Sequence, residues 1–503
     1  MPAGLLLISV DMTVLYTALP TLTTELGADA SQKLWIINAY PLVMAGLLLG
    51  AGTLGDRVGH RRMFLAGLVV FGTASAIAAS APNPAALIAA RALLAVGAAA
   101  MMPATLSLIR VTFTDERERN IAIGVWGSMA VAGSALGPIV GGLLLEHFWW
   151  GSVFLINVPV VVVALVAAVL LAPGGSGHAD RPWDAVASAQ VMAGLVGLVY
   201  AIKEAARPDR EPTHLAIALV VAAIGLTLFA RRQRRQEDPL LDFRLLRDRR
   251  IVSGVLAAGL AMFANAGIQL VLTQRLQLVA GWSPLESGLL VAAFAGGALP
   301  AGVVAGGLVH RLGPAPLIVG GLAANAAGTL LTLLLTPGVV PFVDIHPDHM
   351  AWTIPGMLVA GVGMGLAMTA ASASIMGNAP AHRAGMAASV EEVSYELGSL
   401  TGVAILGSVL TSLYTATVQL PAGVDESAAD SLDAGLAAAG GLPADQAAGL
   451  LDAAHAAFDH GYTTTLLIAT VALALGSALA ARLAARHNGV RQDQPTQVTE
   501  PAA

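Results

Sequence analysis

The sequence predicts an all-α integral membrane protein, and three observations support this prediction. Of the 503 residues, 56% are hydrophobic and 12% are charged, which is about half the charged fraction of soluble domains. The mean hydropathy is +0.74. Apolar runs of about 20 residues, the length that crosses a bilayer, recur along the whole chain. The chain contains no Cys, which excludes disulfides and thiolate metal sites.

The apolar runs predict fourteen membrane-spanning helices. They are centred near residues 14, 45, 73, 98, 134, 162, 193, 221, 262, 297, 325, 363, 398 and 474. The 55 Gly and 26 Pro have no strict period, so they indicate closely packed, locally broken spans rather than collagen or disorder. The first run holds Asp11 and lacks a basic segment before it, which argues against a cleaved signal. Met1 almost begins this helix, which leaves open whether a cytoplasmic leader is missing.

The distribution of basic residues predicts that both termini are cytoplasmic. With the N-terminus inside, the cytoplasmic loops and tail hold 20 of the 26 Lys and Arg residues, and the opposite loops hold five. The basic stretch at 231–250 is interpreted as a solvated linker that faces anionic headgroups, and nucleic-acid binding is the weaker alternative. The longest outer loop, about 415–460, has seven acidic residues and no Lys or Arg. A short helical hairpin and a plain polar connector fit this loop equally well.

Two short segments form an internal repeat. GTLGDRVG at 52–59 and GGLVHRLG at 306–313 align without a gap, and each lies between two predicted spans on the cytoplasmic side. The repeat predicts two six-helix bundles with two helices inserted between them, and paired halves are one of the known transporter plans. The expected divisions are 1–172 for the first bundle, 173–250 for the inserted helices and linker, 251–486 for the second bundle, and 487–503 for a disordered cytoplasmic tail.

Four segments resemble the motifs of one transporter family. They are GTLGDRVGHRRMFL from residue 52, GSALGPIVGG at 133–142, the stretch around Arg91, and DMTVLYTALP at 11–20. Through them the sequence resembles the major facilitator superfamily (MFS) and, within it, the fourteen-span drug/proton antiporters of the QacA-like and LfrA-like kind. In the order given, the segments match motif A, motif C (the antiporter signature), the arginine of motif B, and the helix 1 motif. One departure is His310, which stands where Asp56 stands in the first half. The second copy is therefore not expected to repeat the ionic role of that acid.

Motif A is predicted to form a breakable latch between the two halves. Asp56 can pair with Arg or accept hydrogen bonds from a facing helix N-terminus, and Gly52 and Gly59 are expected to allow the tight turn. The alternative is that these charges, with Arg57 and Arg61 among them, only follow the inside-positive bias. That alternative does not account for an acid at this place.

Motif C is predicted to form a close helix contact. Its small residues are Gly133, Gly137, Gly141 and Gly142, which let another helix approach, and Pro138 bends the helix. The resemblance implies that this helix seals the cytoplasmic side when the transporter faces outward. Packing alone is the alternative, and the two interpretations overlap.

The stretch SVEEVSYELG at 389–398 places three acids in an apolar run. Glu392 and Glu396 share a helix face, and Glu391 is rotated from Glu392 by about 100°. Desolvating several like charges is unfavourable unless some are protonated or paired. We expect these acids to titrate as a coupled set, so that a bound cation expels protons and protons expel the cation.

Asp11 and Arg91 are the other ionisable residues of predicted function within the spans. A buried Arg must face protein or water, and pairing with Asp11 or a backbone carbonyl would be structural. Proximity to titrating acids would instead give Arg91 a part in coupling, which the resemblance favours. The resemblance also implies that Asp11 and the glutamates line one cavity. Glu392 and Asp11 are assigned first as proton-coupling and cation-binding residues, and Glu391 and Glu396 second.

Candidate substrate-pocket residues are aromatic, Met and amide side chains within the spans. Met adapts its shape and aromatic faces attract cations, although packing is the commoner use of any single such residue. The candidates are Tyr16, Tyr40, Met44, Met102, Trp126, Asn265, Gln269 and Phe294.

Together these features predict a proton-coupled exporter of lipophilic cations, such as quaternary ammonium compounds, dyes and amphipathic drugs. It would act by alternating access, as a multi-pass protein of the bacterial plasma (inner) membrane. The expected partners are cationic small molecules, protons and membrane lipids, without nucleic acid, and a monomer is expected. The sequence shows no P-loop and no recognisable nucleophile and base pair, so no enzyme, metal or cofactor is predicted. Two alternatives stay open: an exporter of an endogenous lipid or siderophore, and a non-transporting membrane scaffold or sensor.

Overall fold

The computed structural model describes residues 2–28, 30–172, 184–205, 211–236, 239, 241, 243, 245–282, 284–339, 350–380, 383–421, 424–429 and 431–492. Within these ranges every regular element is helical, which confirms the all-α fold class. The last helix continues to Gln492, past the predicted start of the tail at 487. The rest of that tail lies outside the described residues.

The helices follow the predicted order. In the first part of the chain they are α1 (Pro2–Leu26), α2 (Ala30–Val58), α3 (His60–Ala79), α4 (Pro84–Thr112), α5 (Glu116–His147), α6 (Ser152–Leu155) and α7 (Asn157–Leu171). The inserted pair is α8 (Ala185–Ala205) and α9 (Pro212–Gln233). The last part has α10 (Arg249–Gln274), α11 (Pro284–Leu312), α12 (Pro314–Leu334), α13 (Ile354–Asn378), α14 (Ala384–Thr417), α15 (Leu432–Ala439) and α16 (Ala444–Gln492). Short helical turns are η1 (Leu245–Arg247), η2 (Arg275–Val279), η3 (Met350–Thr353) and η5 (Glu426–Ala429).

Each predicted span centre falls inside one of the long helices. Among the described residues, 12 helices are long and apolar enough to cross a membrane. The two predicted spans outside this set are α1 and α5, of 25 and 32 residues. The count of fourteen spans therefore stays a prediction.

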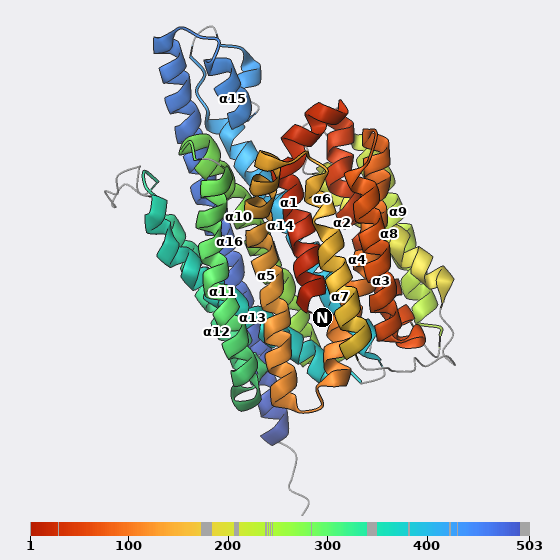
Figure 1. The fold of residues 1–503 in the computed structure, drawn as a ribbon. Helices are drawn as coiled ribbons and strands as arrows, with labels where there is room; N and C mark the ends of the chain where they lie inside the picture. The colour runs from red at the N-terminus through yellow and green to blue at the C-terminus, as the bar shows by residue number, and fades with distance from the viewer. Residues whose placement is uncertain are drawn as a thin grey trace, which may run out of the picture.

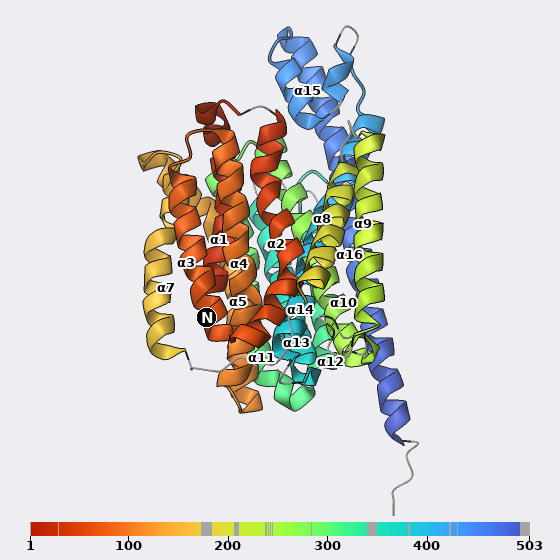
Figure 2. The same cartoon turned by 90° about the vertical axis from the view of Figure 1, so that its right-hand side faces the viewer.

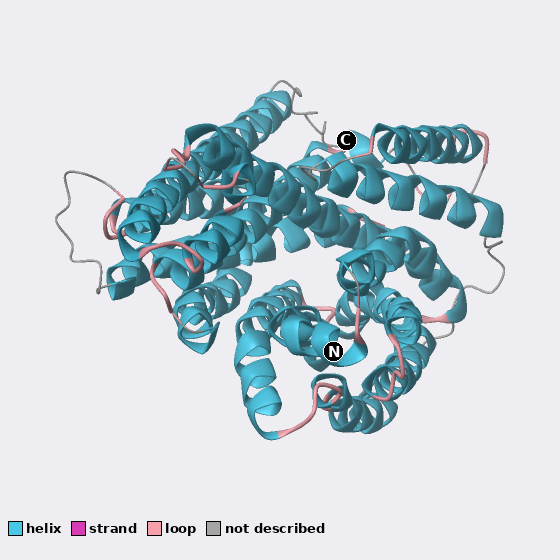
Figure 3. Cartoon of the chain, turned by 90° about the horizontal axis from the view of Figure 1, so that it is seen from above, coloured by secondary structure: helices cyan, strands magenta, loops and turns pink. Residues whose placement is uncertain are grey.

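The helices run side by side in an elongated bundle (Figure 1). The inserted helices α8 and α9 pack on each other, and α8 lies against α2 and α14 at the edge of the bundle (Figure 2). Seen from above, the other helices fall into two groups (Figure 3). One group holds α1–α7 and the other α10–α14 with α16, and they meet along α5 with α11 and α2 with α14.

The acidic loop contains a helical hairpin made of α15 and the first turns of α16, at the upper end of the bundle in Figure 1. Ser431 caps α15, because its Oγ accepts a hydrogen bond from Ala434 N at 3.2 Å. Leu432, Leu450 and Phe458 are buried. The two helices and their buried apolar residues therefore favour the helical hairpin over the plain polar connector.

The internal repeat marks two equivalent turns. Gly59, between α2 and α3, has φ 102°, and Gly313, between α11 and α12, has φ 77°. Only Gly adopts this backbone region without strain. Gly52 does not share this task, because it lies inside α2, where a Cβ would collide with Gly385 O and Ser389 Oγ. Its role is close helix packing, which corrects the prediction that it allows the turn.

Arg275 departs from its expected place in an outer loop, because it is buried at the π-helical end of α10. Its Nε and Nη2 lie 2.8 and 3.2 Å from the carboxylate of Asp459 in α16, and Nη2 donates to Pro337 O at 2.8 Å. The guanidinium carbon lies 5.4 Å from the ring centroid of Tyr462. This cation therefore ties α10, α16 and the chain after α12 together.

Candidate functional site

Asp11 of α1 and Arg91 of α4 form an ion pair inside the first group of helices. Arg91 Nη1 lies 2.9 Å from Asp11 Oδ2, and Arg91 Nε donates to Ile36 O at 3.3 Å. The two side chains are 0% and 2% exposed. Both partners proposed for Arg91 as alternatives, the acid and a backbone carbonyl, are thus present together. A pair buried this deeply is stable only if its other polar atoms are also satisfied.

Asn157 of α7 satisfies the second oxygen of Asp11. Its Nδ2 donates to Asp11 Oδ1 at 2.7 Å and lies 3.3 Å from Ser75 Oγ of α3. Arg91 also lies 4.7 Å from the ring centroid of Tyr40 in α2, a cation–π distance. Sequence reasoning missed Asn157 and Ser75. A lone Asn in the apolar run of α7 was the available signal, whereas a Ser within a span carries little.

The three glutamates of α14 are all buried. Glu391 and Glu392 are 0% exposed and Glu396 is 8% exposed. Ser372 of α13 and Tyr395 both donate hydrogen bonds to Glu391 Oε1, and their hydroxyl oxygens are 3.2 Å apart. Neither hydroxyl was predicted. Tyr395 could have been found, because it follows Glu391 by one helical turn and therefore shares its face.

Glu392 has a different environment from Glu391. Among the described residues, neither of its carboxyl oxygens has a hydrogen-bond partner, and Glu391 Oε2 also lacks one. Glu392 interacts electrostatically with Glu391 and Glu396, and both of these interactions are repulsive when the acids are ionised. A buried carboxyl group without donors is favourable only when it is neutral or when a cation accompanies it. This site is therefore suited to hold either a proton or a positively charged guest.

Tyr40 links the two sets of acids. Its side chain is fully buried, and its hydroxyl has no hydrogen-bond partner among the described residues. It interacts electrostatically with Asp11, Arg91 and Glu396. The structure thus brings Asp11 of α1 and Glu396 of α14 into the surroundings of one side chain.

The other pocket candidates have mixed environments. Trp126 is 1% exposed, and its Nε1 donates to Thr105 Oγ1 at 2.9 Å, so it packs between α5 and α4. In α10, Gln269 Nε2 lies 3.4 Å from Asn265 Oδ1. Three apolar candidates belong to the hydrophobic core: Met44, Met102 and Phe294. The side chain of Tyr16 lies outside the described part of the structure.

Asp56 of motif A connects the two groups of helices. Its Oδ1 accepts a hydrogen bond from Gly385 N at 3.0 Å, in the first turn of α14, and lies 3.3 Å from His60 Nε2. A carboxylate at a helix N-terminus is stabilised by the positive end of the helix dipole. One turn later, Ser389 Oγ donates to Leu48 O at 2.9 Å. Motif A therefore holds the helix that carries the three glutamates.

The neighbouring motif A residues make other contacts. Arg61 Nη2 donates to Val169 O at 2.7 Å, within the first group, and Arg57 is exposed. The second-half position, His310, is also exposed. Of these side chains, Asp56 makes the hydrogen bond between the two groups. This residue is the acid that the inside-positive bias did not explain.

Further contacts join the two groups. Arg110 of α4 donates to Ala379 O after α13, at the end of the bundle that holds the Gly59 and Gly313 turns. Ser128 Oγ of α5 donates to Leu299 O of α11 at 3.1 Å, nearer the middle of both helices. A Cβ at Gly306 would collide with Asn120 O, so α5 and α11 touch closely. The two groups are therefore closed against each other at this end.

Motif C packs on the helix that carries Asp11. Cβ atoms at Gly133 and Gly137 would collide with α1, and Thr13 Oγ1 of α1 lies 3.4 Å from Gly133 O. Gly141 is buried. A Cβ at Gly142 would meet no atom of another helix within 4 Å in the described structure, which corrects its predicted place on this face. The reason is that consecutive helical residues point about 100° apart. The side chain of Pro138 is outside the described part.

Buried acids inside two packed groups of helices define a polytopic membrane protein on the plan of a secondary transporter. A family model described as "Major Facilitator Superfamily" matches residues 3–403, and the chain belongs to this family.

Curated relatives cover most of the chain. The "Multidrug efflux pump LfrA" of Mycolicibacterium smegmatis is 40% identical over 478 residues, which are 94% of this chain and 93% of that protein. The "Methyl viologen resistance protein SmvA" of Salmonella typhimurium is 39% identical over 464 residues, 91% of this chain and 92% of that protein. The "Puromycin resistance protein pur8" of Streptomyces alboniger is 36% identical over 411 residues, 81% of this chain and 80% of that protein.

The crystal structure of the human organic anion transporter MFSD10 (TETRAN) has a similar fold. Its TM-score is 0.59 at 16% sequence identity, with 94% of this chain and 97% of that chain covered. At this identity the likeness concerns the fold alone. Family membership, the bacterial relatives and the apolar helices place the chain as a multi-span protein of the bacterial inner membrane.

Proposed function

We propose that the protein is a proton-coupled efflux antiporter that exports lipophilic cations by alternating access. The observation that carries this proposal is Glu392, a fully buried acid with no hydrogen-bond donor among the described residues and with two acids for neighbours. The relatives named as a multidrug efflux pump and as resistance proteins support efflux of toxic compounds. We propose no enzymatic activity, metal or cofactor, and we propose that the carrier acts as a monomer.

Coupling follows from competition for the same carboxyl groups. A lipophilic cation beside Glu392 favours the ionised form, and the proton held there leaves. Protonation from the other side of the membrane removes the negative charge that retains the cation, and the cation leaves. Because linkage is reciprocal, each ligand weakens the other by the same factor. If more than one proton enters per monovalent cation, the membrane potential adds about 2.3 kcal/mol per charge per 100 mV.

Within this proposal the two acid sites have separate tasks. Asp11 is held by an ion pair with Arg91 and a hydrogen bond from Asn157, so its negative charge stays constant during the transport cycle. Glu391 and Glu392 carry the charge that varies. Tyr40 interacts electrostatically with both Asp11 and Glu396, so a change of charge at Glu396 alters the electrostatic environment of this side chain in the first half.

Alternating access requires the contacts between the two groups to break and reform. We propose that the end with the Gly59 and Gly313 turns faces the cytoplasm, because the basic residues of motif A and of 231–235 belong to that side by the positive-inside rule. With Asp56 bonded to Gly385, that side is closed. Export then requires this latch to open for loading and to close before release.

Proton release upon cation binding tests the proposal directly. The detergent-solubilised protein is mixed with tetraphenylphosphonium in weakly buffered solution, and released protons are measured with a pH dye. We expect release from the wild type and from Glu146→Gln, whose altered acid is exposed, and a large reduction in Glu392→Gln. Equal affinity for the cation at acidic and alkaline pH, without proton release, would sink the proposal.

A further inference from the structure

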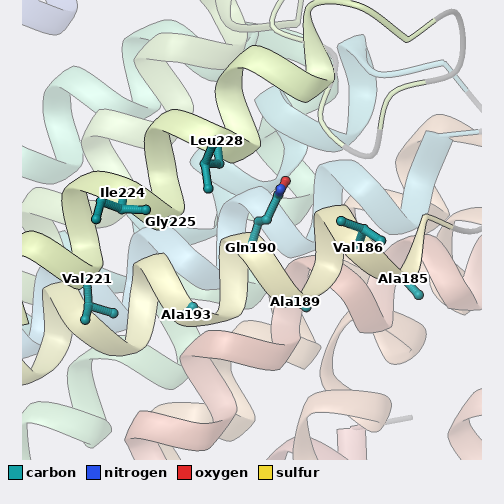
Figure 4. Close-up of a pocket in the computed structure, with 9 residues that line it drawn as sticks. All are labelled: Ala185, Val186, Ala189, Gln190, Ala193, Val221, Ile224, Gly225 and Leu228. Atoms are coloured by element: carbon teal, nitrogen blue, oxygen red, sulfur yellow. The ribbon is translucent and has the colours of Figure 1, made fainter.

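An apolar groove of about 530 Å³ lies between the inserted helices α8 and α9. Figure 4 shows its lining. Small residues from α8 form much of it, and larger apolar side chains from α9 stand opposite. The lining residues are Ala185, Val186, Ala189, Gln190, Ala193, Val221, Ile224, Gly225 and Leu228. Its volume lies within the range of small-molecule sites, about 300–1,000 Å³.

Fixed contacts hold α8 and α9 together along the groove and at one end of it. Along the groove the helices touch through glycines, because a Cβ at Gly197 would lie 2.7 Å from Ala222 N and one at Gly225 2.6 Å from Gly194 N. At one end, Asp184, just before α8, lies 2.5 Å from Arg232 Nε of α9. The spacing between α8 and α9 is therefore held over the length of the groove.

The Asp184 carboxylate is well suited to this clamp. Partial burial raises its pKa, but hydrogen bonds from Arg232, the Ala187 N–H and Gln236 outweigh this effect and leave the pKa below its usual value. The acid is thus ionised at neutral pH. It engages Arg232, and the neighbouring Arg231 is exposed.

Basic residues stand at the clamped end of the groove. Leu228 is the last lining residue of α9, and Arg231 follows it by three positions, on the same side of the helix. Arg231 and Arg235 are both exposed. Inside the groove, Gln190 Oε1 is buried without a hydrogen-bond partner among the described residues. The groove is therefore apolar along its length and cationic at one mouth.

We propose that this groove binds an anionic phospholipid, with one acyl chain along α8 and α9 and the phosphate at Arg231 and Arg235. An acyl chain matches the apolar lining, and the phosphate matches the exposed arginines in charge. Basic pockets between spanning helices on the cytoplasmic side are a general mode of binding acidic headgroups. A zwitterionic lipid fills the same apolar space without the net ionic attraction, so selectivity for the anionic headgroup distinguishes a site from ordinary lipid contact.

The groove is separate from the acids of the transport site. On the opposite side of α8, Ala187, Val191 and Leu195 pack in one cluster with Leu49 of α2 and Met386 of α14. A bound lipid therefore contacts α8 from outside, while the latch helices contact it from inside. Loss of this site and loss of proton coupling are consequently different outcomes that different measurements detect.

Native mass spectrometry of the full chain tests the proposal. The detergent-solubilised protein is titrated with dioleoylphosphatidylglycerol or dioleoylphosphatidylcholine, and bound lipids are counted. We expect one tightly bound phosphatidylglycerol, and weaker binding of phosphatidylcholine. Arg231→Ala should weaken phosphatidylglycerol about fivefold, the effect of about one charge near a membrane surface. Ala189→Phe, which fills the groove, should remove the tight site.

Two matched variants control for general effects. Arg62→Ala removes an exposed basic residue of α3, and Val220→Phe enlarges an exposed apolar residue of α9 that does not line the groove. Both should bind phosphatidylglycerol like the wild type. Equal affinity for the two lipids, or a tight site that survives Ala189→Phe, would overturn the proposal. So would a dimer that Ala189→Phe dissociates, because the groove would then hold a second copy of the chain.

Discussion

The two halves of the molecule bury acids in opposite ways. Asp11 has a donor for each carboxylate oxygen, from Arg91 and Asn157, and the pair sits in the interior as a complete unit. Glu392 is equally buried but has no donor among the described residues. Neutralising Asp11 would leave Arg91 buried without its counterion, so we expect Asp11 to keep its charge. An unsatisfied acid changes its protonation readily, so the contrast separates a fixed charge from a variable one.

The same asymmetry appears in the repeated turns. Gly59 and Gly313 share a left-handed backbone, so the repeat preserves the turn. The side chain three positions before each glycine differs: Asp56 binds the first turn of α14, whereas His310 is exposed. The repeat thus preserves the backbone geometry and leaves the ionic latch to one half.

The largest expected effect comes from breaking the satisfied pair. Arg91→Leu leaves Asp11 buried without its cation and should lower stability by about 3–5 kcal/mol. Thermal unfolding in detergent measures this. The double variant Asp11→Asn with Arg91→Leu should recover much of the loss, because no charge remains unpaired. An Arg91→Leu protein as stable as Arg62→Leu would contradict the view that the pair is a structural unit.

Glu392→Gln should behave in the opposite manner. Removing a repelled, donor-free acid should leave the melting temperature unchanged or higher, while proton-driven dye efflux from proteoliposomes falls by at least about tenfold. Glu146→Gln is the control, since that acid is exposed. Wild-type efflux with wild-type pH dependence in Glu392→Gln would remove this residue from the mechanism.

Tyr395→Phe tests the intermediate case, Glu391, which has hydrogen-bond donors on one carboxyl oxygen and none on the other among the described residues. The change removes one donor to Glu391 and should cost about 1–3 kcal/mol of stability, and it should shift the pH profile of efflux. Tyr414→Phe removes a hydroxyl that donates to Ala428 O in the hairpin region, so it should leave the pH profile in place. Identical pH profiles for both variants would show that the hydroxyl of Tyr395 does not tune the acid.

Asp56→Asn should have a smaller effect, because the amide oxygen can still accept from Gly385 N and only the charge–dipole attraction, about 0.3–1 kcal/mol, is lost. The chain has no Cys, so a single cysteine in place of Ala388, which is 0% exposed, reports opening of the latch. Maleimide labelling should accelerate about two- to fivefold. His310→Asn should leave the rate unchanged, and acceleration there would contradict the asymmetry between the repeats.

The smallest effect on stability is expected at Asp184, a partly exposed acid just before α8 that can be compared with the buried acids. Its pKa is below the usual value, so its contribution to stability is complete above the pKa of the unfolded chain, about 4, and is lost as pH falls through the folded value. Asp184→Asn should therefore lower the melting temperature slightly at neutral pH. The difference from the wild type should vanish in strong acid, and a difference that persists there would rule out this charge.

Much of the site followed from local pattern. An ionisable residue in an apolar run demands a partner, so Asp11, Arg91 and the three glutamates could be named before their contacts were known. Ser75 and Ser372 could not be selected in this way, because single hydroxyl groups are common in spans. Gly52 was assigned to a turn because it stands near one in the chain, and only its approach to Gly385 shows its packing role. Arg275 was assigned to an outer loop, and only the structure shows that the helix continues through it in π-form.

By itself the sequence determined the long helices, their order, the repeated turns and the acids and arginine within the spans, because hydropathy and backbone preference act over short stretches of chain. The tertiary structure alone decided which charges are satisfied. Asp11, Arg91 and Asn157 are far apart in the chain, and so are Asp56 and Gly385. Whether a buried polar atom has a donor depends on what the neighbouring helices place beside it, and that is settled by how the helices pack.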